Sequence, residues 1–368
     1  MPNTITLIHV SVPMTEPFRI SSGEVTNKES ILVRIDLNGI SAFGEASPMS
    51  GGFYSIETPD STWESLLSHA IPAMIDDGTF QPEFVEKRMK KDKTEPFAWA
   101  GLEGALWDLK VQEEDRSFID ELGTTLNPIP SGLAVGIYPT VEGLLEACTR
   151  YLESGYQRLK IKIEPGWDIK PLQAIRETFG DIPLMVDANA AYTNDHFPIF
   201  DELDKMSLMM IEQPLAKNNI EGHAQLQARL STPICLDESA SDIEAVKQAI
   251  DAKACRIVNI KIQRLGGLCQ AKKVYDLCVE HSIPTWMGTM PELGIGALHA
   301  LYMSLLPNCT YPTDVEASSR WFVEDIIRPP IEVKNGMIEI APEHSNRPSV
   351  DMDAVDRYTV REKSVLLM

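Results

Sequence analysis

Residues 158–261 contain five apolar runs of one kind: RLKIKI (158–163), IPLMVD (182–187), SLMMIE (207–212), PICLD (233–237) and RIVNIK (256–261). Each run has an ionisable residue at or next to its end, and these residues are Lys162, Asp187, Glu212, Asp237 and Lys261. They lie 25, 25, 25 and 24 positions apart. A strand that is buried on both faces is expected to be apolar throughout, so a charge that recurs in phase with the strands indicates a functional position. A single charge of this kind could be an exposed loop residue, but a loop has no reason to keep the phase.

Three further runs extend the pattern, at residues 132–137, 283–288 and 308–312. Each run is followed by an amphipathic stretch of about 10 to 15 residues, which predicts eight strands that alternate with helices. A repeat of this length over eight units spans about 200 residues, the size of a (β/α) barrel. We therefore predict an α/β fold with a TIM-like barrel over residues 128–320. The strand-end charges would meet at its C-terminal mouth, where barrel enzymes carry their catalytic groups.

Residues 1–127 follow a different pattern. Apolar and polar side chains alternate over residues 31–37, meet Asn38-Gly39 and resume over residues 40–43. This predicts a β-hairpin, because both turn residues tolerate positive φ. Apolar residues at helical spacing then predict helices over 61–74 and 97–111. We predict an N-terminal α+β domain here.

The composition excludes several classes of protein. Of 368 residues, 43% are hydrophobic and 24% charged, as in an ordinary globular protein. The net charge of −21 argues against a nucleic acid or an anionic membrane surface as a partner. The six cysteines form no CxxC pair or zinc-like cluster, so we expect reduced thiols. Because the N-terminus lacks a signal-peptide pattern and no run approaches about 18 apolar residues, we expect a cytoplasmic protein.

Three of the strand-end residues, Asp187, Glu212 and Asp237, form an all-oxygen donor set without His or Cys. Such a set suits Mg²⁺ or Mn²⁺ better than zinc. Without a cation, converging carboxylates would repel one another, and at least one would tend to stay protonated. We therefore predict an octahedral Mg²⁺ site, with Mn²⁺ as the alternative.

Lys162 and Lys261 flank this acidic set. Lys160 lies two residues before Lys162 and so on the same face of the strand. Its like charge, together with desolvation, is expected to lower the pKa of Lys162 towards that of a general base. A cation that binds a substrate carboxylate, with an amine on each face of the adjacent carbon, is suited to removing an α-proton. The alternative is an amphipathic strand whose lysines extend to solvent.

Several segments resemble one family: KIKIEPGWD (160–168), VDANAAY (186–192), IEQPL (211–215), CLDES (235–239) and NIKIQRLGG (259–267). They are similar to the enolase superfamily and, within it, to the muconate-lactonizing subgroup. The greatest similarity is to the family of o-succinylbenzoate synthases and N-succinylamino acid racemases. The resemblance runs nearly end to end, through PFRISSG (17–23), GEASPM (44–49) and EASSRWFVEDI (316–326).

The resemblance implies a (β/α)7β barrel, an N-terminal capping domain with lid loops, and a C-terminal segment, residues 321–368, that returns to the cap. It also implies that Asp187, Glu212 and Asp237 bind Mg²⁺. Lys162 and Lys261 would be the acid–base pair. In the family's synthases the counterpart of Lys162 is the base and that of Lys261 stabilises the enediolate electrostatically, whereas racemases use both lysines to exchange protons.

The resemblance places further residues on the substrate side. Lys160 lies beside the base, and Asn189 would contact the substrate or a metal ligand, although it could instead cap the following helix. Tyr54 and Arg19 fall in the expected lid loops. Met290 belongs to the segment from 289 to 297, which departs from the family pattern.

Three further residues bear on the substrate and the catalytic groups: Ala134, His281 and His299. Ala134 stands where the family commonly has serine, so it also puts the substrate in question. His281 and His299 are expected to be packing or surface residues rather than members of a His–Asp dyad, because His281 precedes the seventh run and His299 falls in a helix.

Three functions follow from this pattern. The first is a lyase that dehydrates a cyclohexadiene carboxylate to o-succinylbenzoate in menaquinone biosynthesis. The alternative is an isomerase that racemises N-succinylamino or other N-acylamino acids. A non-catalytic binding barrel is a remote alternative, because a binding protein does not need lysines on both faces. The expected partner is a small-molecule carboxylate, and a homo-oligomer is compatible with the sequence.

Overall fold

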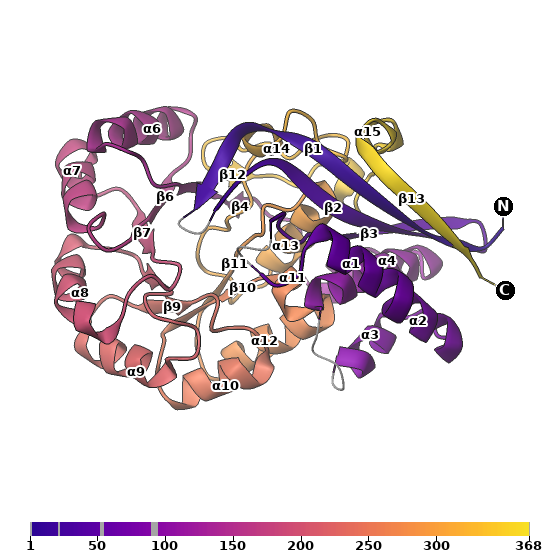
Figure 1. Cartoon of the computed structure of the whole chain (residues 1–368), viewed down its shortest axis with the longest axis horizontal. Helices are drawn as coiled ribbons and strands as arrows, with labels where there is room; N and C mark the ends of the chain where they lie inside the picture. The colour runs from indigo at the N-terminus through magenta and orange to yellow at the C-terminus, as the bar shows by residue number, and fades with distance from the viewer. Residues whose placement is uncertain (1, 21–22, 52–54, 90–94, 368) are drawn as a thin grey trace.

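The computed structural model describes residues 2–20, 23–51, 55–89 and 95–367. Figure 1 shows a capping region built mainly from the N-terminal part of the chain, beside a ring of strands and helices. The cap contains an antiparallel sheet in the order β13-β1-β2-β3. Its strands are β1 (Thr4–Ile20), β2 (Gly23–Leu37), β3 (Ile40–Ala46) and β13 (Thr359–Leu366). Because β13 pairs with β1, the end of the described chain lies in the cap sheet.

The predicted hairpin is confirmed. Leu37 pairs with Ile40, and the two turn residues, Asn38 and Gly39, have φ values of 52° and 84°. This left-handed backbone suits asparagine and glycine, which explains why the turn falls there.

The cap helices cover one face of this sheet. The helix predicted over 97–111 is α4, and the one predicted over 61–74 is divided by a π-helical turn at Leu66–Ala70. Helix α4 packs so closely on β3 that a Cβ atom added to Gly44 would lie 2.2 Å from the carbonyl oxygen of Gly101. The cap helices are α1 (Pro59–Ser65), α2 (Ile71–Asp77), α3 (Pro82–Met89), α4 (Pro96–Glu113) and α5 (Phe118–Leu122).

The second part of the chain forms a curled, seven-stranded parallel sheet whose strands follow one another in chain order. Its strands are β5 (Gly132–Val135), β6 (Arg158–Lys162), β7 (Leu184–Asp187), β8 (Ile211–Glu212), β9 (Ile234–Leu236), β10 (Ile257–Ile260) and β11 (Thr285–Met287). The helices around it are α6 (Val141–Glu153), α7 (Ile169–Phe179), α8 (Phe197–Leu203), α9 (Ile220–Arg229), α10 (Ile243–Asp251), α11 (Ile262–Leu265), α12 (Leu268–Glu280) and α13 (Gly294–Ser304). The predicted α/β class and TIM-like barrel are confirmed.

The eighth predicted strand, at residues 308–312, is not a regular strand. Instead, this segment connects the two edges of the sheet through isolated parallel bridges, from Cys309 to Thr285 and from Thr313 to Ser131. Pro312 has no N–H to donate, which prevents a continuous ladder. The segment therefore completes the ring between β11 and β5 in an irregular form.

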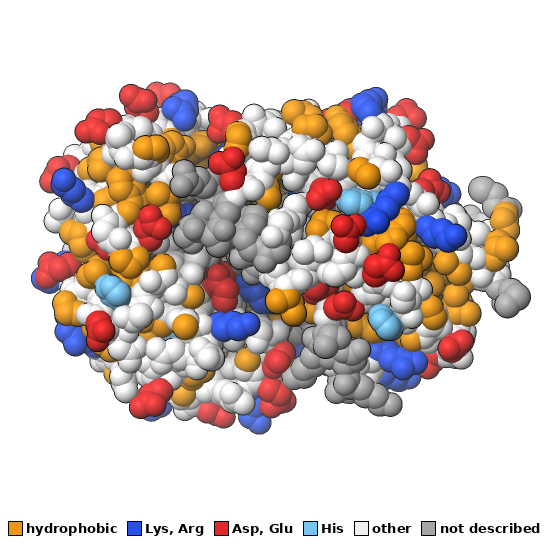
Figure 2. All heavy atoms as spheres, viewed as in Figure 1, with side chains coloured by type: hydrophobic (Ala, Val, Ile, Leu, Met, Phe, Trp, Pro, Cys, Tyr) orange, Lys and Arg blue, Asp and Glu red, His pale blue; other side chains and the backbone are white. Residues whose placement is uncertain are grey.

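The remaining C-terminal residues pass along the barrel and back to the cap. Their elements are α14 (Ser318–Trp321), β12 (Met337–Ile338) and α15 (Met352–Tyr358). Strand β12 pairs with β4 (Ile129–Pro130), a short strand that precedes the barrel sheet in the sequence. None of the described helices combines the length and apolar character needed to cross a bilayer. On the face in Figure 2, lysine and arginine side chains are interspersed with acidic ones.

Below the mouth of the barrel, five apolar side chains fill the interior: Met185, Met210, Cys235, Ile257 and Trp286. The first three each precede a strand-end carboxylate by two residues and so lie on the same face, one layer deeper. This layer gives the charged mouth a dry, packed floor.

Candidate active site

The strand ends place the predicted charged residues on neighbouring strands. In the parallel register, Lys162 is the Cα partner of Asp187, and Asp187 is the partner of Glu212. Asp237 directly follows β9 and Lys261 directly follows β10. All five side chains are buried, and their charges therefore act on one another in a medium that screens them weakly.

Lys160 contacts the largest number of acidic groups at the mouth. Its Nζ lies 3.0 Å from Asp187 Oδ2, 2.8 Å from Glu212 Oε2 and 2.8 Å from Asp314 Oδ2. Burial alone would lower the pKa of Lys160, but the surrounding carboxylates hold it well above its usual range. The sequence predicted a lysine that mainly repels Lys162, whereas the structure places Lys160 among carboxylates that balance its charge.

Lys162 and Lys261 each pair with one carboxylate of the set. Lys162 Nζ lies 2.6 Å from Asp187 Oδ2 and 2.6 Å from Asn189 Oδ1. Lys261 Nζ lies 3.0 Å from Asp237 Oδ2, and the other carboxylate oxygen of Asp237 contacts Arg264. The two lysines thus approach the acidic set from strands at opposite ends of it.

These contacts separate the pKa values of the three carboxylates. Burial raises the pKa of Asp187, but Lys160 and Lys162 outweigh burial and bring it to about 2. Burial likewise opposes ionisation of Asp237, but Arg264 and Lys261 hold its pKa far below the usual range. Burial and the neighbouring Asp187 raise the pKa of Glu212 to about 8. In the metal-free protein, Glu212 is therefore the carboxyl group that keeps a proton most readily.

The three carboxylates have the donor chemistry of a hard-cation site. Glu212 Oε2 is buried and lies 2.8 Å from Lys160 Nζ, but it accepts no hydrogen bond from the described residues. It therefore keeps an unused acceptor position. Among the described residues, no three Asp, Glu, His or Cys side chains are grouped to hold a metal as they stand. The Lys160 ammonium group contacts two of the acids, Asp187 and Glu212, and balances part of their charge. The residues fit the predicted cation in donor chemistry and burial.

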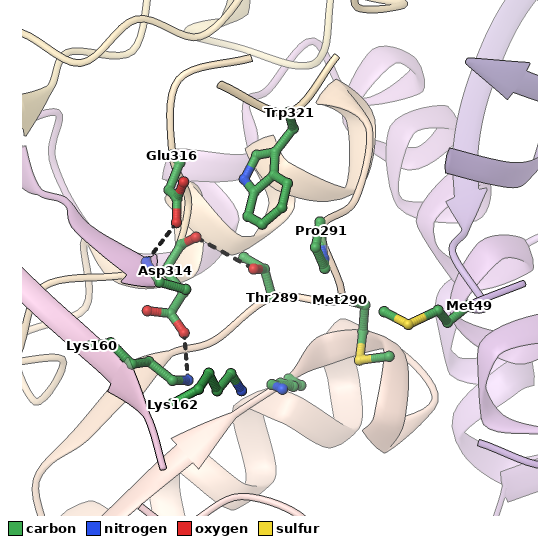
Figure 3. A pocket seen from close by; sticks show the side chains of 11 residues that line it. Met49, Lys160, Lys162, Thr289, Met290, Pro291, Asp314, Glu316 and Trp321 are labelled. Atoms are coloured by element: carbon green, nitrogen blue, oxygen red, sulfur yellow. Dashed lines mark hydrogen bonds and ion pairs between the residues drawn. The ribbon is translucent and has the colours of Figure 1, made fainter. Parts of the chain in front are cut away.

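A cavity opens above these groups (Figure 3). Its empty volume is about 500 Å³, including its opening to solvent. Three lysines, Lys160, Lys162 and Lys261, contribute to its lining, and the other lining residues are Met49, Ala134, Thr289, Met290, Pro291, Asp314, Glu316 and Trp321. Its lining combines charged, polar and apolar side chains, as the lining of a small-molecule site does.

The cap fixes the segment that forms one wall of the cavity. Glu45 of β3 accepts hydrogen bonds from Leu293 N and Gly296 N, at 2.8 and 2.9 Å. Lys28 of β2 donates to the carbonyl oxygens of Met290 and Pro48, at 3.5 and 3.3 Å. The cap thereby holds the start of α13 and the loop before it.

The remaining predicted residues have different outcomes. Asn189 does not cap a helix, because Thr193 is the N-cap of the turn that follows. The Asn189 side chain instead accepts a hydrogen bond from Lys162 and donates one to Glu238. Met290 lines the cavity, but its N–H donates to Glu292 Oε2 at 3.0 Å. Tyr54 and the Arg19 side chain lie outside the described residues.

The two histidines are placed as expected. His299 is buried in α13, near the rings of Phe118 and Tyr302, and burial lowers its pKa to about 4. His281 is an exposed residue that ends α12, before β11. Neither position belongs to the cavity lining.

Sequence reasoning missed four polar residues at the mouth. Asp314 and Glu316 follow the irregular eighth segment, beyond the last residue of its apolar run. Glu238 is adjacent to Asp237. Asn259 donates to Glu212 Oε1 at 2.9 Å, and its place two residues before Lys261 is the same signal that identified Lys160.

The comparisons with known proteins define the class. Residues 3–123 match the mandelate racemase / muconate lactonizing enzyme N-terminal domain, and residues 143–345 match the enolase C-terminal domain-like family. The chain therefore belongs to the enolase superfamily, and it is an enzyme.

Individual relatives carry two different activities. An o-succinylbenzoate synthase of Geobacillus kaustophilus is 40% identical over 356 residues, which cover 96% of this chain and 95% of that protein. An N-succinylamino acid racemase of Amycolatopsis sp is 40% identical over 326 residues, covering 88% and 89%. The crystal structure of an enolase superfamily member from Listeria innocua has a TM-score of 0.94 and 32% identity, covering 100% of this chain and 99% of that one. The homologues thus include both lyases and isomerases.

The charge balance at the mouth leads to a first prediction. Lys160→Met should destabilise the metal-free protein by about 3–5 kcal/mol, because it leaves buried carboxylates without their shared cation. Urea denaturation in EDTA would measure this loss. Lys334→Met is the control, since Lys334 is exposed and should change stability by no more than about 0.5 kcal/mol. Equal stability of the two variants would contradict the assigned role of Lys160.

Proposed function

We propose that the protein is a Mg²⁺-dependent, o-succinylbenzoate synthase-like dehydratase that acts in menaquinone biosynthesis. The observation that carries the proposal is the pair Lys162 and Lys261, which line one cavity on either side of three buried carboxylates. The relatives that share 37–40% identity and carry the synthase name support the same activity.

In this proposal the reaction begins with removal of the α-proton. The amine of Lys162, in its neutral form, takes the proton from the carbon next to the substrate carboxylate. The carbon–oxygen bond to the neighbouring hydroxyl group then breaks, and the protonated Lys162 gives its proton to that hydroxyl, which leaves as water. The ring becomes aromatic, so the net change is loss of one water without oxidation or reduction. Lys261 supplies positive charge to the enediolate from the opposite side.

Asp187, Glu212 and Asp237 would hold the cation. When bound, a divalent cation there supplies positive charge for the substrate carboxylate, which makes the α-proton more acidic. Asn189 links Lys162 to Glu238 and so orients the amine, while the 289–293 loop, fixed by the cap, limits the room for the substrate.

A second candidate is racemisation of N-acylamino acids. It needs the same first proton transfer, with Lys261 returning a proton to the opposite face. Two observations favour it: the Met290 N–H is already occupied by Glu292, and Pro291 has no N–H. This wall therefore offers few backbone donors to a second carboxylate such as that of a succinyl group.

Cation binding is the second prediction. Isothermal titration calorimetry should detect one Mg²⁺ or Mn²⁺ site in the wild-type protein. Glu212→Gln should weaken that binding by at least about tenfold, because an amide replaces a charged oxygen donor. Glu332→Gln changes an exposed carboxylate and should bind like wild type. Unchanged affinity in Glu212→Gln would remove Glu212 from the site.

The third prediction concerns the base. Lys162→Ala should lower α-proton exchange with deuterated water by several orders of magnitude, because the acceptor of the proton is gone. Its affinity for the cation should persist, since all three carboxylates remain. Exchange measured by proton NMR at the wild-type rate would show that another group is the base.

The fourth prediction separates the two activities. The purified protein should form o-succinylbenzoate from the cyclohexadiene carboxylate in the presence of Mg²⁺ and should lose this activity in EDTA. An absorbance assay of aromatisation measures the dehydration, and chiral chromatography of N-acetylamino acids, which carry no second carboxylate, measures racemisation. Synthase turnover equal to the EDTA control, alongside good racemisation, would assign the protein as an isomerase.

A further inference from the structure

Gln213 is a buried polar residue that directly follows Glu212 at the end of β8. It is excluded from solvent, and its φ of 37° lies in the left-handed region that residues with a side chain rarely adopt. Its carbonyl oxygen accepts a hydrogen bond from Ala190 N at 2.8 Å, and its N–H donates to Cys235 O at 2.9 Å. A backbone of this kind persists only where surrounding contacts hold it, and here they come from the β7 side and from β9.

The side chain of Gln213 uses both ends of its amide group. Oε1 accepts hydrogen bonds from Asp237 N and Ser239 N, each at 3.0 Å. Nε2 donates to Leu215 O at 2.9 Å and to Ser239 Oγ at 2.8 Å. A glutamine amide has two acceptor positions and two donor hydrogens, so these four bonds fill its capacity. Reversal of the amide would set its NH₂ group against two N–H groups, and the side chain is therefore fixed in one orientation.

These bonds tie the end of β8 to residues 237–239, the turn that follows β9. The Asp237 carboxylate in this turn lies 3.0 Å from Lys261 Nζ. Glu238, the next residue, accepts a hydrogen bond from Asn189 Nδ2 at 3.1 Å. Gln213 is thus placed to determine how far the Asp237 carboxylate lies from the carboxylate of β8.

We propose that Gln213 is a positioning residue, which sets the spacing between Asp237 and Glu212 and thereby the size of cation that the acidic set accepts. The inference rests on the proposed function, because it concerns the cation site of that function. Mg²⁺ requires nearly octahedral ligands at about 2.0–2.1 Å, whereas Ca²⁺ accepts more varied geometry at about 2.3–2.6 Å. Carboxylates held at a fixed spacing favour the smaller cation, and a loosened pair loses that preference.

Gln227 offers a matched control that acts on the same strand. It is also a buried glutamine, and its Oε1 accepts from Ile234 N at 2.7 Å while its Nε2 donates to Thr232 O at 3.3 Å. These bonds hold the start of β9, at the opposite end of the strand from Asp237. Methionine at either position removes a buried amide of similar length, but only the change at Gln213 acts on the barrel mouth.

Isothermal titration calorimetry with MgCl₂ and with CaCl₂ would compare the wild-type protein, Gln213→Met and Gln227→Met. The ratio of Mg²⁺ affinity to Ca²⁺ affinity should fall at least about tenfold in Gln213→Met, because the turn that carries Asp237 is no longer fixed. Gln227→Met should keep the wild-type ratio, even though both variants lose stability. An unchanged ratio in Gln213→Met would overturn the proposal, and so would an equal fall in the two variants.

Amide hydrogen exchange in EDTA tests the same contacts without a cation. NMR should show slow exchange of the Asp237 and Ser239 N–H groups in the wild-type protein and in Gln227→Met. The exchange should be at least about tenfold faster in Gln213→Met, because the acceptor of both groups is gone. Fast exchange of these two amides in the wild-type protein would overturn the proposal, and this measurement decides even where a variant does not fold.

The two measurements separate failure of this inference from failure of the proposed function. A wild-type protein that binds no divalent cation would refute the proposed function, and the amide exchange rates would then decide whether Gln213 fixes the turn. A wild-type protein that binds Mg²⁺ and exchanges α-protons, with the same affinity ratio in Gln213→Met, would refute this inference alone.

Discussion

The ion pairs of Lys160 with Asp187, Glu212 and Asp314 are the interaction on which the barrel mouth depends. Several carboxylates meet above an apolar floor, where water cannot screen them, so each needs a nearby positive charge to remain ionised. In the metal-free protein Lys160 supplies that charge to Asp187 and Asp314, whose pKa values are lowered, whereas the pKa of Glu212 stays raised. In the proposed function, a divalent cation held by Asp187, Glu212 and Asp237 would supply further positive charge to the same group of carboxylates. The ion pairs that stabilise the metal-free protein therefore involve two of the buried carboxylates that would bind the cation.

Contacts between the cap and the barrel shape the cavity on its other side. Glu45 binds two N–H groups at the start of α13, and Lys28 binds carbonyl oxygens in both parts of the chain. These buried charged groups couple the cap sheet to the loop that carries Met290 and Pro291. The position of this cavity wall thus depends on how the cap sheet packs against the barrel, as well as on the strand ends.

A relative named as an o-succinylbenzoate synthase and one named as an N-succinylamino acid racemase are each 40% identical to this chain. In the proposed function, both reactions would begin with removal of an α-proton, so Lys162, Lys261 and the three carboxylates would not distinguish them. The distinction has to come from the opposite wall, where Glu316, Thr289 and Pro291 line the cavity.

The sequence alone determined the barrel, the hairpin at Asn38-Gly39 and the strand-end charges, because local periodicity reports which face of a strand a residue occupies. It also identified Lys160 by its two-residue spacing from Lys162. Only the tertiary structure decided the partners across the barrel. Asp314 binds a lysine 154 positions earlier, and Glu316 meets Ala134 on a distant strand, through a segment whose strand pattern Pro312 interrupts. Such contacts depend on how the ring closes, and no local pattern encodes that closure.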